Sequence, residues 1–267
     1  MTHETSPVAA DLPISATNIA EEAFAKVPQV TLLFWLIKIA ATTLGETGGD
    51  AVSMSMGLGY LVGTAIFGVV FVAAVYAQIR ARAFHPFLYW FTIIASTTVG
   101  TTLADFADRS LGIGYAGGSS LLLALLLVSL FAWHRTLGSI AVETVATPKA
   151  EMFYWLTIMC SQTLGTALGD WVADTQGLGY VGGMVIFGSL LAITAALYFW
   201  GRVSHVLLFW AAFIMTRPLG AVLGDFLDKP VDHGGLALSR YTASLVLLAA
   251  IVAMILMFKQ RAATRAH

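Results

Sequence analysis

Charged residues are scarce in this sequence. Of its 267 residues, only 11% are Asp, Glu, Lys or Arg, whereas 58% are hydrophobic. Soluble domains carry about 25% charged residues, so the composition argues against a water-soluble enzyme. The formal net charge of −1 provides no basic surface for nucleic acid. A single cysteine, Cys160, excludes an internal disulfide and a cysteine metal cluster.

The sequence also lacks the short motifs of common hydrolases and nucleotide-binding enzymes. It contains no G-x-S-x-G, H-E-x-x-H or P-loop pattern, so we expect neither an enzyme nor a bound cofactor. Residues 1–27 place no basic stretch ahead of an apolar run. We therefore interpret them as a cytoplasmic tail rather than a cleaved signal peptide.

Long apolar segments dominate the rest of the chain. Each is close to the roughly 20 residues with which an α-helix crosses about 30 Å of hydrocarbon. The segments are 30–49, 58–79, 86–104, 113–133, 152–169, 178–200, 205–224 and 241–258. They predict an all-α membrane protein of eight transmembrane helices, with one membrane domain at 28–260 and a cytoplasmic tail at 261–267.

Four copies of a two-helix unit make up the predicted membrane domain. Each copy reads W-x9-G-x3-[GA]-D, and three copies continue with x6-G-[LI]-G-Y. The tryptophans are Trp35, Trp90, Trp155 and Trp210, and the copies occupy about 28–83, 84–136, 150–202 and 203–260. Because each copy holds two helices, all four share one orientation. This predicts parallel repeats, pseudo-symmetric about the membrane normal.

Basic residues predict the orientation. Nine Lys and Arg residues lie at one set of helix ends, whereas the other set has only Arg109, Lys229 and Arg240. The positive-inside rule then places both termini in the cytoplasm. Nine of the fifteen acidic residues lie toward the opposite, outer side. The tryptophans fall near the cytoplasmic helix ends, where we expect an aromatic belt.

An aspartate repeated in every copy carries the functional hypothesis. The glycines before it are predicted to let helices pack closely. A carboxylate near hydrocarbon costs about 2.5–3.5 kcal/mol on insertion scales, so four of them indicate side chains directed into a shared cavity. Glu46 lies one turn before the first aspartate, on the same helix face. The predicted metal ligands are Glu46, Asp50, Asp105, Asp170 and Asp225. Alternatively, the aspartates are ordinary interfacial turn residues.

Polar residues one turn further in extend this stripe. Residues seven positions after each tryptophan are predicted to line a pathway; they are Thr42, Thr97, Gln162 and Arg217. We expect Arg217 to pair with Asp225 or Glu46 and to compete with a bound cation; the alternative is a purely structural ion pair. Lys38, the other intramembrane cation, is expected to extend toward the cytoplasm. Further acids, predicted in exposed loops at the outer mouth, are Asp108, Asp174 and Asp228.

The repeat resembles that of bacterial four-repeat membrane proteins catalogued as a repeat of unknown function. The resemblance covers about residues 30–260 through the W…G-x3-[GA]-D pattern. It implies a multi-pass protein of the bacterial inner membrane and brings no activity with it. The fourth copy departs from the pattern, since it reads His233-Gly234-Gly235-Leu236 in place of Gly-Leu-Gly-Tyr.

Three functional hypotheses follow. Because hard divalent cations prefer oxygen ligands, the first is a secondary transporter, an exporter of a divalent metal cation such as manganese, whose carboxylates also exchange protons. The second is a proton-coupled exporter of small organic cations. The third is a non-transporting membrane module that binds a partner or a lipid through its cytoplasmic segments 80–84 and 135–151. An intramembrane enzyme remains a further alternative without a named reaction.

Overall fold

Eight long helices form the described part of the protein. The computed structural model describes residues 25–263. The helices are α1 (Leu32–Asp50), α2 (Gly59–Arg80), α3 (Pro86–Asp105), α4 (Tyr115–Leu137), α5 (Pro148–Asp170), α6 (Gly179–Trp200), α7 (His205–Asp228) and α8 (Arg240–Met257). The described part of the chain contains no β-strand, only an isolated bridge between Pro28 and Ala262. The predicted all-α fold of eight helices is confirmed.

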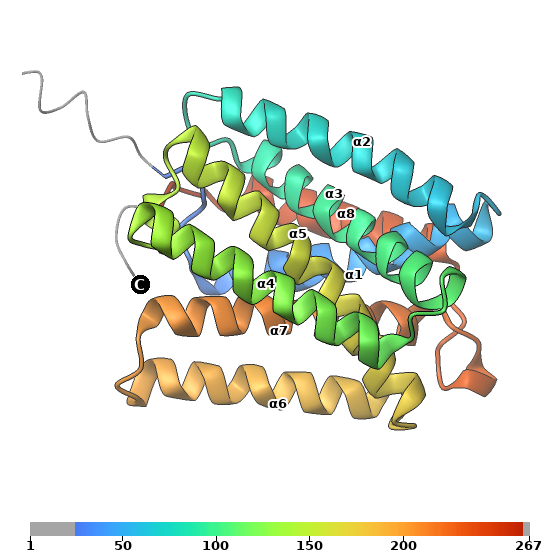
Figure 1. Ribbon diagram of the computed structural model, residues 1–267. Coiled ribbons are helices and arrows are strands. Elements are labelled where there is room, and N and C mark those ends of the chain that lie inside the picture. The colour runs from blue at the N-terminus through green and yellow to red at the C-terminus, as the bar shows by residue number, and fades with distance from the viewer. Residues whose placement is uncertain (1–24, 264–267) are drawn as a thin grey trace, which may run out of the picture.

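Six of these helices are long and apolar enough to cross a membrane: α2, α3, α4, α6, α7 and α8. The other two, α1 and α5, also carry buried charged or amide side chains, Lys38, Glu46 and Asp50 in α1 and Glu151, Gln162 and Asp170 in α5. Figure 1 shows the helices running alongside one another, with α2 and α6 at opposite edges of the bundle.

Short sequence signals mark the helix ends. Thr31 and Thr147 cap α1 and α5, because each side-chain oxygen accepts a hydrogen bond from the backbone N–H three residues on, at 3.3 Å. The repeated Gly-[Leu/Ile]-Gly-Tyr motif connects two helices in three copies, and its glycines have φ between 65° and 77°. Side chains other than glycine rarely adopt this conformation, which explains why both positions of the motif are glycine.

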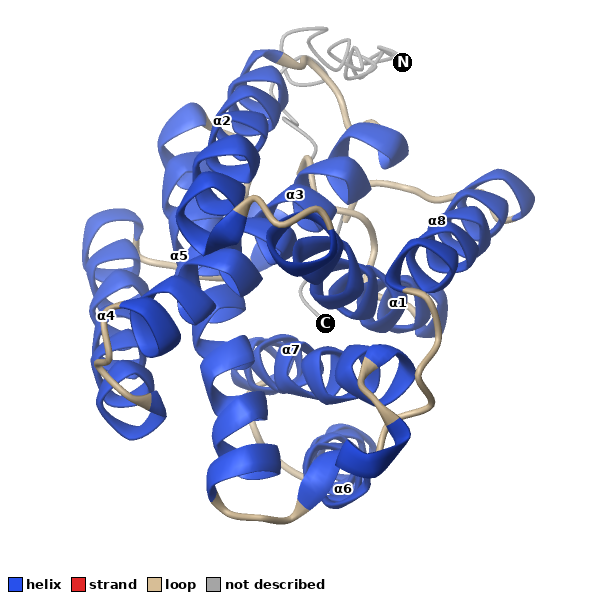
Figure 2. Cartoon of the chain, turned by 90° about the vertical axis from the view of Figure 1, so that its right-hand side faces the viewer, coloured by secondary structure: helices blue, strands red, loops and turns tan. Residues whose placement is uncertain are grey.

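The odd-numbered helices form an inner ring. Helix α1 contacts α3 and α7, and α5 contacts the same two helices. Each even-numbered helix packs outside the ring, against the odd helix of the next copy: α2 on α3, α4 on α5, α6 on α7 and α8 on α1. Figure 2 shows α1, α3, α5 and α7 around the middle of the molecule, with the other four outside them.

The repeated glycines hold this ring together. Gly45 lies against Thr97, Gly100 against Gln162, Gly165 against Arg217 and Gly220 against Thr42. Each glycine therefore faces the residue seven positions after the tryptophan of the next copy, and the last glycine faces the first copy. At Gly100, an added Cβ would lie only 3.0 Å from the Cβ of Gln162. These contacts confirm the predicted packing role of the glycines.

Aromatic side chains fill one end of the ring. Trp90, Trp155 and Trp210 are at most 3% exposed, so the predicted aromatic belt is wrong for these three. The indole of Trp90 donates to Gln260 Oε1 at 2.8 Å, and that of Trp210 donates to the Ile140 carbonyl at 2.9 Å. The tryptophans turn inward because they pack between the odd helices, where the N–H groups of Trp90 and Trp210 find acceptors.

The chain enters and leaves the bundle at this aromatic end. Gln29 N–H donates to the Arg261 carbonyl and Ala263 N–H to the Val27 carbonyl, both at 2.8 Å. Lys26 N–H donates to Val145, in the connector between the two halves, at 3.0 Å. Of the predicted tails, 1–24 and 264–267 lie outside the described residues. Residues 25–27 and 261–263, which were predicted to belong to the tails, instead pack with the membrane domain.

Candidate functional site

Side chains four residues apart fill the ring in layers about 6 Å apart. The five layers are Phe34, Tyr89, Tyr154 and Phe209; Lys38, Ile93, Ile158 and Phe213; Thr42, Thr97, Gln162 and Arg217; Glu46, Thr101, Thr166 and Ala221; and Asp50, Asp105, Asp170 and Asp225. None of these twenty residues is more than 8% exposed. The interior therefore changes from aromatic at one end, through cationic and neutral polar groups, to acidic at the other.

Arg217 lies at the centre of the ring. Its Nη2 donates to Glu46 Oε2 at 3.0 Å and to Thr101 Oγ1 at 2.6 Å. The same nitrogen contacts Thr166 Oγ1. One guanidinium thus connects α7 with α1, α3 and α5 through the polar side chains of the next layer. The expected partner of Arg217 is therefore Glu46, not Asp225.

Lys229 joins two of the repeated aspartates. Its Nζ lies 2.6 Å from Asp50 Oδ2 and 2.9 Å from Asp225 Oδ1, and 3.9 Å from Asp228 Oδ1. Burial by itself lowers the pKa of Lys229, but the carboxylates of Asp225, Asp50 and Asp228 outweigh it and hold that pKa well above its ordinary value. Arg240 adds a second cation, with its Nε 3.2 Å from Asp228 Oδ2.

Arg109 joins the other two aspartates. Its Nε lies 2.9 Å from Asp105 Oδ1, and its Nη2 lies 3.3 Å from Asp170 Oδ2. The four repeated aspartates are therefore divided into two pairs, one joined by Lys229 and the other by Arg109; Arg240 Nε also lies 3.8 Å from Asp50 Oδ2. The three basic residues at the same end of the bundle as these aspartates are Arg109, Lys229 and Arg240. Their side chains contact the aspartate carboxylates rather than extending freely into solvent.

Three carboxylates come close enough to share an ion. Glu46, Asp50 and Asp225 each offer an oxygen within 4.8 Å of the others, and all three are buried. We call this group the carboxylate cluster. Within the described residues, Asp50 Oδ1 is buried without a hydrogen-bond partner. Asp105 and Asp170, the other two predicted ligands, lie outside the cluster. Carboxylate oxygens are ligands for hard divalent cations such as Mg²⁺, Ca²⁺ and Mn²⁺.

The predicted pathway residues lie one or more layers from the cluster. Thr42 Oγ1 bonds backbone carbonyls, including that of Thr216 at 3.2 Å. Gln162 Nε2 lies 3.5 Å from Ser96 Oγ. Thr97 Oγ1 is buried and has no partner among the described residues. These three contribute no ligand to the carboxylate cluster; they share a layer with Arg217, and that layer adjoins the layer of Glu46.

Lys38 does not extend to the cytoplasm, and that expectation is wrong. Its side chain is 0% exposed, and its Nζ lies 4.1 Å from the centroid of the Phe213 ring. Lys38 precedes Glu46 by two turns on the face of α1 that points into the ring. Its stem therefore runs among side chains of the neighbouring helices, and the amine rests on an aromatic face.

The second set of acids is only partly exposed. Asp174 is exposed, as expected, but Asp108 and Asp228 are only 9% and 7% exposed. Their prediction as exposed loop residues is wrong, because the helices run on past the repeated aspartates. Asp108 lies in η2 (Phe106–Ser110), a π-helical turn that continues α3, and Asp228 is the last residue of α7.

Sequence reasoning missed the cations that hold the aspartates. A signal was available, because Arg109 and Lys229 each follow a repeated aspartate by four residues. This spacing places both side chains on one helix face. It occurs in the second and fourth copies, whereas the first and third have Met54 and Asp174 at that position. The alternation matches the two pairs seen in the structure.

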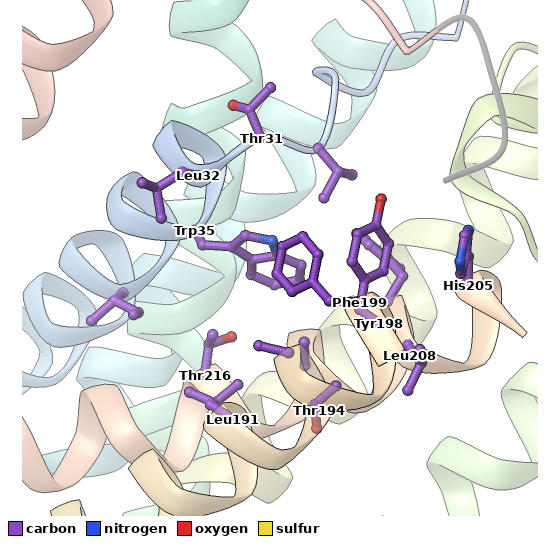
Figure 3. A pocket seen from close by; sticks show the side chains of 15 residues that line it. Thr31, Leu32, Trp35, Leu191, Thr194, Tyr198, Phe199, His205, Leu208 and Thr216 are labelled. Carbon is purple, nitrogen blue, oxygen red and sulfur yellow. The ribbon is translucent and has the colours of Figure 1, made fainter. Parts of the chain in front are cut away.

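A separate groove lies on the outside of the ring, between α1, α6 and α7. Its volume is about 390 Å³, and its lining includes Trp35, Leu191, Tyr198, Phe199, Phe209 and Thr216. Figure 3 shows the aromatic side chains of this groove and Thr216 below them. The groove is mostly apolar and touches none of the three residues of the carboxylate cluster.

Comparison with known families supports the repeat. Residues 33–84, 88–139, 153–204 and 208–262 each match the family described as Repeat of Unknown Function (DUF347). Comparisons with curated proteins and with solved structures give no match. The four matches cover most of the chain and confirm the resemblance seen in the tryptophan, glycine and aspartate pattern. The chain belongs to this family, the DUF347 repeat proteins.

Proposed function

We propose that this protein is a secondary transporter, an exporter, of a divalent metal cation such as manganese, and that the carboxylate cluster binds the cation. The observation that carries the proposal is the convergence of Glu46, Asp50 and Asp225 within 4.8 Å, all buried. The partnerless Asp50 Oδ1 supports it further, because a buried carboxylate oxygen without a donor is stabilised by a cation. The oxygen-only ligand set favours a hard cation over copper(I).

The proposed membrane arrangement assigns the carboxylate cluster to one side of the membrane. We propose that all eight helices span a bacterial inner membrane, with both termini cytoplasmic and the four parallel repeats pseudo-symmetric about the membrane normal. The outer helices then face lipid, and α1 and α5, which carry much of the buried polar material, are shielded in the ring. In this arrangement the carboxylate cluster lies toward the outside, and the aromatic layer and the two chain ends close the cytoplasmic side.

Exchange of protons for metal completes the proposed cycle. The ring holds more acids than the cations that contact them, since five carboxylates, those of Glu46, Asp50, Asp105, Asp170 and Asp225, are contacted by four cations, Arg217, Lys229, Arg109 and Arg240. A divalent cation adds positive charge to this group, and release of that cation leaves carboxylates that accept protons. Cation export coupled to proton entry is the transport mode that this charge balance supports.

Binding and rescue experiments test the proposal. Titration of the purified full-length protein with Mn²⁺, followed by calorimetry, is expected to show binding that Asp50→Asn or Asp225→Asn weakens by about tenfold or more, about 1.4 kcal/mol. Asp174→Asn is the matched control, because Asp174 is an exposed acid of the same end. In a strain lacking the protein, wild type should relieve manganese sensitivity and Asp50→Asn should not. Equal rescue by both would end the proposal.

A second candidate, an exporter of small organic cations, is favoured by the aromatic groove. Trp35, Phe199 and Phe209 line it, and aromatic faces attract organic cations. Thr216, at its inner wall, adjoins Arg217 in the ring. Titration with Mn²⁺ and with tetraphenylphosphonium, followed by tryptophan fluorescence, separates the candidates. A response to tetraphenylphosphonium alone, lost in Trp35→Ala, would favour the organic cation.

A further inference from the structure

Lys229 stands at the start of an unusual connection. It directly follows α7 and precedes Pro230, and the chain then forms the short helix η5 (Val231–His233) before α8 begins. The connection folds back on the end of α7, since Leu236 N–H donates to the Phe226 carbonyl at 2.7 Å and Leu238 N–H to Leu227 at 2.8 Å. This is the copy that lacks the Gly-Leu-Gly-Tyr motif. Lys229 is thus attached to a connection that the other copies do not have.

The ammonium of Lys229 lies where a bound cation would lie. It is 2.6 Å from an oxygen of Asp50 and 2.9 Å from an oxygen of Asp225, and both residues belong to the carboxylate cluster. A divalent metal bonds carboxylate oxygens at about 2.0–2.6 Å. The metal and the ammonium cannot both contact these oxygens, because the two positive charges would then lie within a few ångströms of each other.

We propose that Lys229 is a built-in competitor for the cation site, and that a transported divalent cation binds by displacing its ammonium from Asp50 and Asp225. The inference rests on the proposed function and adds a specificity-determining residue to it. A divalent ion replaces a single positive charge with two. A monovalent ion of similar size brings no such gain in attraction to three carboxylates, so the competition favours divalent over monovalent cations.

Lys229 is better suited to this displacement than either neighbouring arginine. Its side chain is 13% exposed, whereas that of Arg217 is 0% exposed and bonds residues of three other helices. Arg109 holds the second pair of aspartates with a planar guanidinium that contacts both. A lysine is a point charge on a flexible stem, so its ammonium can leave the carboxylates and reach water without moving a helix.

Charge removal at Lys229 tests the competition. In the full-length protein, Lys229→Met retains a flexible apolar stem and loses the ammonium. We expect it to bind Mn²⁺ about tenfold more tightly than wild type, about 1.4 kcal/mol. Arg109→Met is the matched control, since it removes the equivalent cation from the other aspartate pair and should change Mn²⁺ affinity much less. A residue with only a structural role would give weaker or unchanged Mn²⁺ binding in Lys229→Met.

Chemical labelling of Lys229 gives a second readout that needs no variant. Acetylation of lysines in the wild-type protein, followed by mass spectrometry, should modify Lys229 more when Mn²⁺ is present than when Na⁺ of equal ionic strength is present. Unchanged labelling, or Mn²⁺ binding no tighter in Lys229→Met while Asp50→Asn still weakens it, would overturn the competition and leave the proposed function intact. Absence of Mn²⁺ binding in wild type and in Lys229→Met would overturn both.

Discussion

At the scale of single residues, one substitution among the four copies changes what the ring contains. The position seven residues after each tryptophan is Thr, Thr, Gln and Arg. Arginine fits there because Gly165 faces it without a side chain. Its guanidinium then donates a hydrogen bond to Glu46 in the next layer. The residues equivalent to Glu46 in the other three copies are uncharged; they are Thr101, Thr166 and Ala221. Two departures from the repeat thus compensate each other across the ring.

Breaking the Arg217–Glu46 pair should destabilise the protein more than removing both charges. Arg217→Met leaves the buried Glu46 carboxylate without its cation, and removal of one partner from a buried pair costs about 3–5 kcal/mol. Thermal unfolding in detergent should therefore give a lower Tm for Arg217→Met than for the double variant Arg217→Met with Glu46→Gln. Equal Tm values for the single and double variants would contradict the pairing.

The contribution of Lys229 to stability should not fall as the pH rises from about 7 to about 9. A group whose pKa is raised on folding stabilises the folded state fully below its unfolded pKa and loses this effect only as the pH passes its folded pKa. The unfolded pKa of lysine is about 10.4, and the folded pKa of Lys229 is higher. The Tm difference between wild type and Lys229→Met should therefore be at least as large at about pH 9 as at about pH 7, since the carboxylates that attract the ammonium are no less ionised at the higher pH. A difference that shrinks toward the higher pH would show a weakly held ammonium.

At the scale of the helix, all eight elements could be predicted, with ends within four residues of those observed, but the π-helical turns that follow α1, α3 and α5 could not. Apolar length predicts a helix near 86–104, and α3 is found at Pro86–Asp105. The π-helical turn η2 then carries the chain on to Ser110. Hydropathy ends the segment at the aspartate because the side chain is charged, whereas the backbone continues. The same π-helical turn follows Asp50 and Asp170, at Ala51–Ser55 and Trp171–Thr175.

Two glycines of α1 should respond differently to the same substitution. A Cβ on Gly45 would overlap the side chain of Thr97 in α3, whereas one on Gly48 would meet its nearest neighbour, Ser244 Oγ, at 3.9 Å. Gly45→Ala should lose about 1–3 kcal/mol of stability through overpacking. Gly48→Ala should be neutral or gain up to about 1 kcal/mol, because alanine is the better helix former. Thermal unfolding in detergent measures both, and equal effects would place the tight contact elsewhere.

At the scale of the whole molecule, the sequence predicted which residues are polar and repeated but not which of them meet. Spacing places Asp50, Asp105, Asp170 and Asp225 at one level, as the structure has them. Their division into two pairs depends on Lys229 and Arg109. Which aspartates these two cations contact depends on which helices are neighbours in the ring and on how each helix is rotated about its axis. No single copy contains either pair, because each cation joins aspartates of two copies. Lys38 illustrates the same limit, because a helix position alone does not tell a lipid-facing stem from an interior one.

The orientation of the protein in the membrane can be tested by cysteine labelling, because the sequence has few thiols to remove. Cys160 is the single cysteine, so Cys160→Ser gives a background without thiols. Thr136, at the end of α4, and Asp232, in the connection before α8, are both exposed. They lie at the helix ends with many and with few basic residues, respectively.

If the positive-inside rule governs this protein, a membrane-impermeant maleimide added to intact spheroplasts should label Asp232→Cys and not Thr136→Cys. Permeabilised cells should show labelling of both variants, which confirms that each thiol is reactive. The reverse pattern would place the carboxylate cluster toward the cytoplasm, where the same ligands would take up cations from inside the cell before releasing them across the aromatic end. The direction of any metal movement inferred from rescue experiments therefore depends on this labelling result.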